Sequence, residues 1–133
     1  MLKHQRFIFY LIWIVLAFIQ AGLTELQDDE AYYWVYSKFP DWGYYDHPPM
    51  IAILVKAGYA IFPNELGVRL FPVLMNAGTL LLLERMISRK NLALFFAIAL
   101  SLALLQLGGF MAVPDIPLVF FTVIFFFAYR NFL

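Results

Sequence analysis

The stretch Phe7–Leu23 reads FIFYLIWIVLAFIQAGL and contains no charged residue. A helix needs about 20 predominantly apolar residues to cross a bilayer. Three further apolar stretches follow along the chain, at Gly67–Leu83, Leu92–Val113 and Ile116–Leu133. The sequence therefore predicts an all-α, polytopic helical membrane protein with four spans over these ranges.

The composition of the 133 residues agrees with a membrane protein. Hydrophobic residues make up 64% of the chain and charged residues only 14%, whereas a soluble domain carries about 25% charged residues. A soluble domain of this length has too small an interior to hide so much apolar surface. Nine basic residues balance nine acidic ones without a basic stripe, so nucleic-acid binding is not expected. The absence of cysteine excludes thiolate chemistry and cysteine metal sites.

A shorter apolar stretch, Met50–Phe62, carries Lys56 near its middle. Apolar runs of about 10–14 residues are more typical of interfacial segments than of spans, so an interfacial helix is expected here. Basic residues favour the cytoplasmic side of a membrane. If this helix does not cross, one side receives Lys3, Arg6, Arg85, Arg89, Lys90 and Arg130. We therefore expect a multi-pass membrane protein, with its N-terminus on the cytoplasmic side and an outer loop over residues 24–49.

The outer loop reads TELQDDEAYYWVYSKFPDWGYYDHPP and concentrates acids and aromatics. Asp28 is expected to cap a helix that runs to Lys38 and ends before Pro40. The acids at its start have two interpretations. In the first, they cap the helix, and their negative charges interact favourably with the positive end of the helix dipole. In the second, they include a general base or a metal ligand at the membrane surface. For Asp28 alone the capping interpretation is favoured. For Asp28, Asp29 and Glu30 together the capping and the functional interpretations are about equally favoured, because adjacent carboxylates raise one another's pKa.

A second cluster in the loop is Asp46-His47, which precedes Pro48-Pro49. The two prolines fix the chain in an extended form that presents the pair toward the first acids. A hydrogen bond at a turn is one interpretation of the pair, and a divalent metal site is the other. The ligands of such a metal would come from an incomplete set: Asp29, Glu30, Asp46 and His47.

Two more charged residues stand at the outer ends of spans. Arg69 lies at the start of the second span, and Asp115 lies in the turn Pro114–Pro117 before the fourth. A snorkelling arginine and a turn-forming aspartate explain them without function, as does a pair between the two. Charged residues close to the apolar core of a membrane also mark functional sites. Their place on the same side as the acidic loop favours the functional interpretation.

The order of these motifs resembles the N-terminal part of the dolichyl-phosphate-mannose protein mannosyltransferase-like group. These are glycosyltransferase family 39 enzymes of the GT-C fold, and the aminoarabinose transferases belong with them. The resemblance covers nearly the whole chain. After the first span, it rests on DEAYYW at Asp29–Trp34, YDHPPM at Tyr45–Met50, GVRL at Gly67–Leu70, and Pro114-Asp115.

The resemblance implies a glycosyltransferase that moves a sugar from a polyprenyl-phosphate donor to a protein, lipid or glycan acceptor at the outer face of the cytoplasmic (inner) membrane. The family's catalytic acid, in an Asp-Glu pair, matches Asp29, with Glu30 beside it. The resemblance therefore implies that Asp29 and Glu30 are the catalytic residues, with Asp29 as the general base. His47 stands where the family often has a lysine. The residues expected to bind substrate are Asp46, His47, Lys56, Arg69 and Asp115. Among them, Arg69 and His47 are the candidates for holding the donor phosphate, and Lys56 belongs to the helix where the donor headgroup would emerge.

Members of this family run to several hundred residues with many more spans. The resemblance therefore implies that this chain is an N-terminal portion of a longer protein and is inactive alone. The rival interpretation is a non-catalytic membrane protein, either a small transporter subunit or a scaffold. Transporters place ionisable residues in mid-span, whereas the ionisable residues here crowd at one face, which favours the enzyme.

Overall fold

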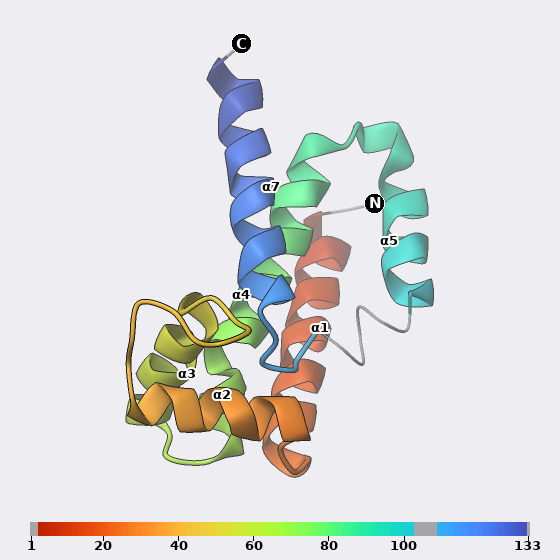
Figure 1. The fold of residues 1–133 in the computed structure, drawn as a ribbon. Coiled ribbons are helices and arrows are strands. Elements are labelled where there is room, and N and C mark those ends of the chain that lie inside the picture. Colours follow the sequence, from red (N-terminus) through yellow and green to blue (C-terminus); the bar gives the residue numbers. More distant parts are fainter. Residues whose placement is uncertain (1–2, 103–108, 133) are drawn as a thin grey trace.

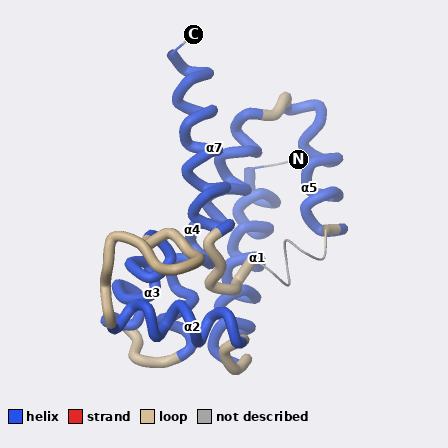
Figure 2. The backbone as a smooth tube through the Cα atoms, in the orientation of Figure 1, coloured by secondary structure: helices blue, strands red, loops and turns tan. Residues whose placement is uncertain are grey.

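The computed structural model describes residues 3–102 and 109–132. In these ranges the chain forms helices, and no strand occurs among them (Figure 2). The all-α class expected from the sequence is therefore confirmed. In chain order (Figure 1) the elements are α1 (Lys3–Leu23), α2 (Asp28–Lys38), α3 (Met50–Ile61), α4 (Glu65–Met86), the 3-10 turn η1 (Arg89–Asn91), α5 (Leu92–Ser101) and α7 (Asp115–Phe132).

Within the described residues, three helices are long and apolar enough to cross a membrane: His4–Leu23, Glu65–Met86 and Asp115–Phe132. They coincide with three of the four expected spans. Helix α4 is the central one, because both α1 and α7 pack against it (Figure 1). The outward faces of α1 and α7 stay apolar and uncovered, as expected where lipid replaces protein.

The third expected span, Leu92–Val113, differs in the structure. Helix α5 covers only ten residues, Leu92–Ser101, about half of what a crossing requires. Residues 103–108 lie outside the described part of the chain. Residues 109–114 form a turn and irregular backbone instead of helix. The N–H of Ala112 donates to Glu30 Oε1 at 2.8 Å, so it does not form the backbone hydrogen bond that a helix would require. The expected helical end at Val113 is therefore wrong.

The start of α2 also corrects a prediction. Gln27 is the N-cap, and Asp28 is the first residue of the helix and not its cap. Glu30 explains this choice, because its Oε2 accepts a hydrogen bond from the backbone N–H of Gln27 at 3.1 Å. Such a reciprocal contact belongs to a capping box. The end of the helix is as predicted, since α2 ends at Lys38.

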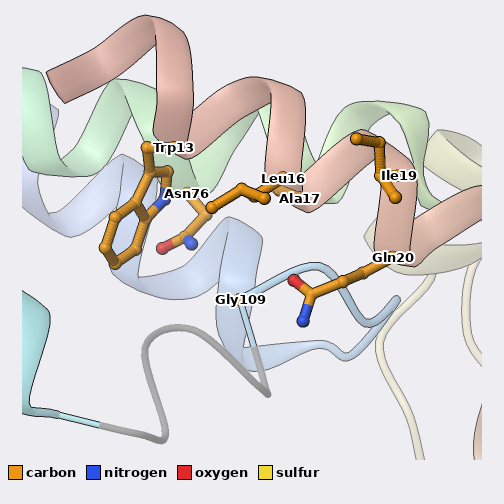
Figure 3. Close-up of a pocket in the computed structure, with 7 residues that line it drawn as sticks. All are labelled: Trp13, Leu16, Ala17, Ile19, Gln20, Asn76 and Gly109. Atoms are coloured by element: carbon orange, nitrogen blue, oxygen red, sulfur yellow. The ribbon is translucent and has the colours of Figure 1, made fainter. Parts of the chain in front are cut away.

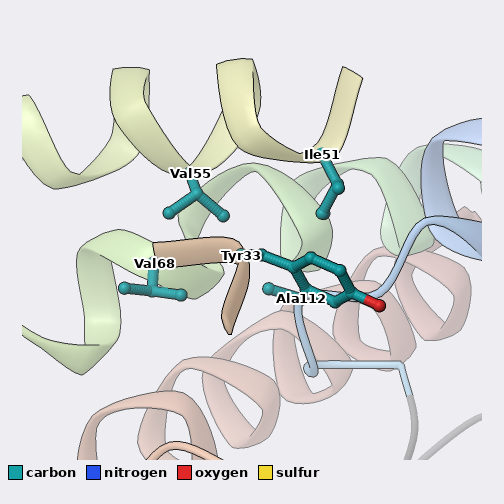
Figure 4. Packing of buried hydrophobic residues seen from close by; sticks show 5 residues of the cluster. All are labelled: Tyr33, Ile51, Val55, Val68 and Ala112. Atoms are coloured by element: carbon teal, nitrogen blue, oxygen red, sulfur yellow. The ribbon is translucent and has the colours of Figure 1, made fainter. Parts of the chain in front are cut away.

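Helix α3 occupies Met50–Ile61, where the sequence indicated an apolar helix over 50–62. It packs on α2 and α4 around a shared core of Tyr33, Ile51, Val55, Val68 and Ala112 (Figure 4). Glycines allow the close approach of α3 to α4. A Cβ atom on Gly58 would clash with the backbone carbonyl of Gly67, and one on Gly67 would clash with that of Phe62.

The two ends of the helical bundle differ in charge. We call the end formed by α2, α3 and residues 39–49 the loop end. The opposite, basic end carries Arg6, Arg85 and Arg130, and Arg130 Nη1 donates to the carbonyl oxygen of Met86 at 2.8 Å. This separation follows the charge distribution of the sequence, and the orientation of the bundle in a membrane stays a prediction.

Candidate functional site at the loop end

Arg69 lies near the start of α4, is completely buried, and has every donor occupied. Its Nε and Nη2 donate to the two carboxylate oxygens of Glu30 at 2.8 and 2.5 Å. Nη1 donates to the carbonyl oxygens of Ala21 and Thr24 at 2.9 and 2.7 Å. Nη2 also donates to the carbonyl oxygen of Glu25 at 2.8 Å. An arginine has five N–H donors, so oxygens of the protein itself take all of them.

This Arg69–Glu30 pair, which we call the loop clamp, joins segments that are far apart in the sequence. It ties the end of α1, the connection to α2, α2 itself and α4, and through Ala112 it also ties residues 109–114. Burial by itself raises the pKa of Glu30. Hydrogen bonds from Arg69 and from the backbone N–H groups of Ala112 and Gln27 outweigh this and hold the pKa of Glu30 below its ordinary value. The clamp is therefore an ionised pair at neutral pH.

The loop clamp bears on two sequence predictions, the phosphate role of Arg69 and the catalytic role of Glu30. Both side chains are shielded from solvent, and a phosphate would have to displace Glu30 or backbone oxygens to reach the guanidinium. The geometry favours the structural interpretation of Arg69. Its partner is Glu30 and not Asp115, the partner that the sequence suggested.

The second polar group of the loop end surrounds the hydroxyl of Tyr33. The ring of Tyr33 is buried in the core, and its oxygen lies 3.3 Å from Nε2 of His47. Figure 4 shows this hydroxyl directed away from the apolar side chains of the cluster. His47 Nε2 lies 3.5 Å from Asp46 Oδ2. Tyr33, His47 and Asp46 thus form a chain of polar contacts that leads from the core to the surface.

Aromatic residues hold this part of the loop against α2. The rings of Tyr36 and Tyr44 stack with 3.8 Å between their centroids, and the Tyr44 hydroxyl donates to the carbonyl oxygen of Tyr36 at 3.0 Å. The hydroxyls of Tyr36 and Tyr32 donate to Asp46 Oδ1 at 3.1 and 3.4 Å. The position of Asp46 is therefore set by side chains on successive turns of α2.

Two further carboxylates, Asp29 and Asp115, complete the group around Tyr33. Burial raises the pKa of the Tyr33 hydroxyl, and the negative charges of Asp29, Asp46 and Asp115 raise it further. The three aspartates are exposed and belong to the first turn of α2, the loop before α3 and the first turn of α7. We call Asp29, Asp46, His47 and Asp115 around Tyr33 the acid cluster.

Helical geometry separates the roles of Asp29 and Glu30. Successive residues of an α-helix point about 100° apart, so neighbours in the sequence face different surroundings. Glu30 faces α4 and is buried in the loop clamp, whereas Asp29 is exposed beside Tyr33. Because the clamp fixes the first turn of α2, it also fixes the position of the Asp29 carboxylate.

Lys56 lies away from the acid cluster. It is exposed on α3 and lines a pocket with Ser37, Lys38 and Tyr59. Of the five residues expected to bind substrate, the structure brings three into the acid cluster, Asp46, His47 and Asp115. The other two, Arg69 and Lys56, lie in different surroundings.

The suggested metal ligands do not converge in the described residues. No group of three or more histidine, aspartate or glutamate side chains suited to a metal ion occurs in ranges 3–102 and 109–132. Glu30 points into the loop clamp, which removes it from the set and leaves Asp29, Asp46 and His47 at one surface. The role of a divalent metal stays a prediction.

A small cavity of about 140 Å³ lies between α1 and α4, next to Gly109 (Figure 3). Its lining is apolar except for the amides of Gln20 and Asn76 and the indole of Trp13. Amides supply hydrogen bonds but neither charge nor acid–base chemistry. The cavity is therefore a weaker candidate for a reaction site than the acid cluster.

Sequence reasoning missed two residues. Tyr33 was only one of several loop aromatics, and nothing in the sequence pattern marks its hydroxyl as the centre of the acid cluster. Glu84 had a signal, because it directly follows the leucines at positions 80–83, and an acid beside an apolar run needs a partner in a membrane. In the structure Glu84 is buried, forms an ion pair with Arg6, and accepts a hydrogen bond from the Tyr10 hydroxyl at 2.8 Å.

Comparisons of this chain with protein-family models, with curated proteins and with solved structures find no match. Its function is therefore argued from the geometry of the acid cluster and from the sequence motifs that form it.

Proposed function

We propose that the chain is part of a membrane glycosyltransferase that moves a sugar from a polyprenyl-phosphate donor to an acceptor hydroxyl. The observation that carries the proposal is the acid cluster, in which the Tyr33 hydroxyl lies 3.3 Å from His47 and exposed carboxylates from three segments lie near enough to raise its pKa. The cluster lies at the loop end of a bundle with three apolar helices of membrane-spanning length. A lipid-linked substrate would meet a water-soluble acceptor at such a place.

Asp29 is the general base in this proposal. A lipid phosphate is already a competent leaving group, so the reaction needs a base for the acceptor proton more than it needs a strong acid. The Asp29 carboxylate is exposed, while the loop clamp holds its helix in place. A single carboxylate base implies direct displacement at the sugar carbon, and hence inversion of its configuration, by analogy with inverting glycosidases.

The other members of the acid cluster have supporting roles. His47, when protonated, is the cation that can hold the negative charge that develops on the donor phosphate. Asp46 lies 3.5 Å from His47 Nε2 and helps to orient its imidazole ring. Asp115, from the first turn of α7, is placed to orient hydroxyl groups of the acceptor or the sugar.

The sequence resemblance is an independent support. The motifs at Asp29, at Asp46-His47 and at Asp115 are separated in the chain, yet His47 contacts the Tyr33 hydroxyl and the three aspartates all act on its pKa. The family likeness further implies additional spans and loops in a longer protein, which would complete the donor site.

A non-catalytic scaffold or transporter subunit is the alternative. Its support is that Arg69, Glu30 and Glu84, all deeply buried, serve packing in this structure. It leaves Asp29 without a task, because this carboxylate lies exposed beside Tyr33 in an already fixed helix. The first interpretation accounts for more of the loop end.

Substitution of Asp29 by asparagine in the complete enzyme tests the proposal. Asp29→Asn preserves shape and removes basicity, so the rate at which polyprenyl phosphate is released from the sugar donor should fall about 10²–10⁴-fold. Donor binding should change little. Asp28→Asn is the matched control, because it removes an exposed acid from the same helical turn and should keep near-normal turnover. Near-normal turnover of a folded Asp29→Asn protein would rule out Asp29 as the base.

A further inference from the structure

A second polar site lies at the far end of α2, away from the acid cluster. A pocket of about 280 Å³ opens between α2 and α3, and its lining includes Lys38, Lys56 and Tyr59. Lys38 is the last residue of α2, whereas Asp29 lies in its first turn. At 1.5 Å rise per residue the two are roughly 13 Å apart along the helix axis, so the pocket is a separate feature.

Aromatic rings fix one of the two ammonium groups of this pocket. Lys38 Nζ lies 4.5 Å from the ring centroid of Trp34 and 4.0 Å from that of Tyr59. The two rings meet edge to face with 5.8 Å between their centroids. Cation–π attraction orients the ammonium but does not neutralise it. Lys38 therefore presents a positioned, uncompensated positive charge.

No carboxylate compensates either lysine within the described residues. The ion pairs formed there use Glu84, Asp46 and Glu30, and neither Lys38 nor Lys56 takes part in one. Two ammonium groups that line one pocket repel each other. An anion bound between them would remove this repulsion, so the pocket has the charge and the size for a phosphate group.

The outer face of α3 indicates where this phosphate comes from. One face of the helix packs on the core through Ile51, Val55 and Gly58. The opposite face is apolar and uncovered, with Ile53 and Ile61 more than half exposed. With only 12 residues, α3 is too short to cross a bilayer, and a short helix with an apolar outward side lies at the boundary of headgroups and acyl chains. Lys56 borders this face, where a long lysine side chain reaches the level of lipid phosphates.

We infer that the pocket binds the phosphate of an anionic phospholipid in the leaflet next to the loop end, held between Lys38 and Lys56. The bound lipid anchors α2 and α3 at the membrane surface and so holds the acid cluster at a fixed depth. This binding does not depend on the proposed glycosyl transfer, and it gives Lys56 a different ligand from the sugar donor expected from the sequence.

Lipid titration of the purified full chain tests the inference. Binding of phosphatidylglycerol and of phosphatidylcholine with the same acyl chains is measured by native mass spectrometry from detergent. The wild type should prefer phosphatidylglycerol. Lys38→Gln and Lys56→Gln should each lower that affinity about five-fold and together about 25-fold, which corresponds to about 1 kcal/mol for each lysine near an anionic surface. Lys90→Gln, an exposed lysine of the basic end, is the matched control and should bind as the wild type does.

Three results would overturn the inference. The first is equal phosphatidylglycerol affinity of the wild type and a folded double variant, as judged by circular dichroism and gel filtration. The second is an equal loss of phosphatidylglycerol affinity in Lys90→Gln, which would show that only the total charge of the protein matters. The third comes from competition with inorganic phosphate. If inorganic phosphate displaces phosphatidylglycerol at equal concentration, the pocket is a free-phosphate site and the lipid assignment is wrong.

Discussion

Helix α4 carries an ion pair at each end, and the two pairs differ in their surroundings. At the loop end, the side chains of Arg69 and Glu30 are 1% and 0% exposed. At the basic end, Arg6 is 35% exposed while its partner Glu84 is completely buried. We call this second pair, with the Tyr10 hydroxyl that donates to Glu84, the basic clamp. The loop clamp collects oxygens from several segments, whereas the basic clamp joins only α1 to α4.

The difference shows how the same chemistry serves two purposes. A completely desolvated pair needs every hydrogen bond satisfied, because an unpaired buried charge costs several kcal/mol. The loop clamp meets this condition and fixes the first turn of α2, where Asp29 lies. The basic clamp keeps its arginine partly exposed, so the loss of Glu84 there leaves a cation that the surroundings can screen and does not disturb the acid cluster.

The largest expected effect comes from breaking the loop clamp. Arg69→Gln leaves the Glu30 carboxylate buried without its cation, and should lower the free energy of unfolding by about 3–5 kcal/mol. Arg85→Gln is the matched control, because Arg85 is an exposed arginine of the same helix. Thermal unfolding in detergent and the amount of protein in the membrane measure both variants. Equal stability of the two would show that the clamp is not structural.

Acid should weaken the loop clamp in a milder way. The folded-state pKa of Glu30 lies below its ordinary value of 4.5. Its stabilising contribution is thus fully present above about pH 4.5 and is lost as the pH falls through the lower, folded-state pKa. The effect should be smaller than that of Arg69→Gln, because a protonated carboxyl still forms hydrogen bonds.

Unfolding measured as a function of pH checks this expectation. The wild type should lose stability in the acid range, and Glu30→Gln should show a flatter profile there because it has no proton to gain. Glu84→Gln removes an acid from the other end of α4 and is the control for general acid effects. The same acid loss in Glu30→Gln as in the wild type would assign the effect to other carboxylates.

The smallest effect is expected at the basic clamp. Glu84→Gln should lower the free energy of unfolding by about 1–3 kcal/mol, the range for a lost charged hydrogen bond. Turnover per folded molecule should stay unchanged, because the acid cluster lies at the other end of α4. Tyr10→Phe removes only the hydroxyl and should cost less. A loss in Glu84→Gln as large as in Arg69→Gln would contradict the distinction between the two clamps.

Part of the loop end followed from the sequence. The helix that ends at Lys38, the apolar helix that begins at Met50, and the shared side of Asp29, Asp46 and Asp115 were all predicted from local patterns and from the alternation of spans. The partner of Arg69 was not predicted. Glu30 lies 39 positions away from Arg69 in the chain, and several acids in the same loop were equally plausible partners.

The sequence by itself determined which segments are helical and apolar, because a long apolar run fixes its own backbone hydrogen bonds and needs no distant partner. Only the tertiary structure decided that Glu30 turns inward while Asp29 stays outside, and that Tyr33 is the centre of the acid cluster. It also decided that residues 109–114 leave the helical form, because Ala112 donates to a carboxylate 82 positions earlier in the chain. Such contacts depend on how α2 lies relative to α4 and to residues 109–114, and no local pattern in the sequence encodes that arrangement.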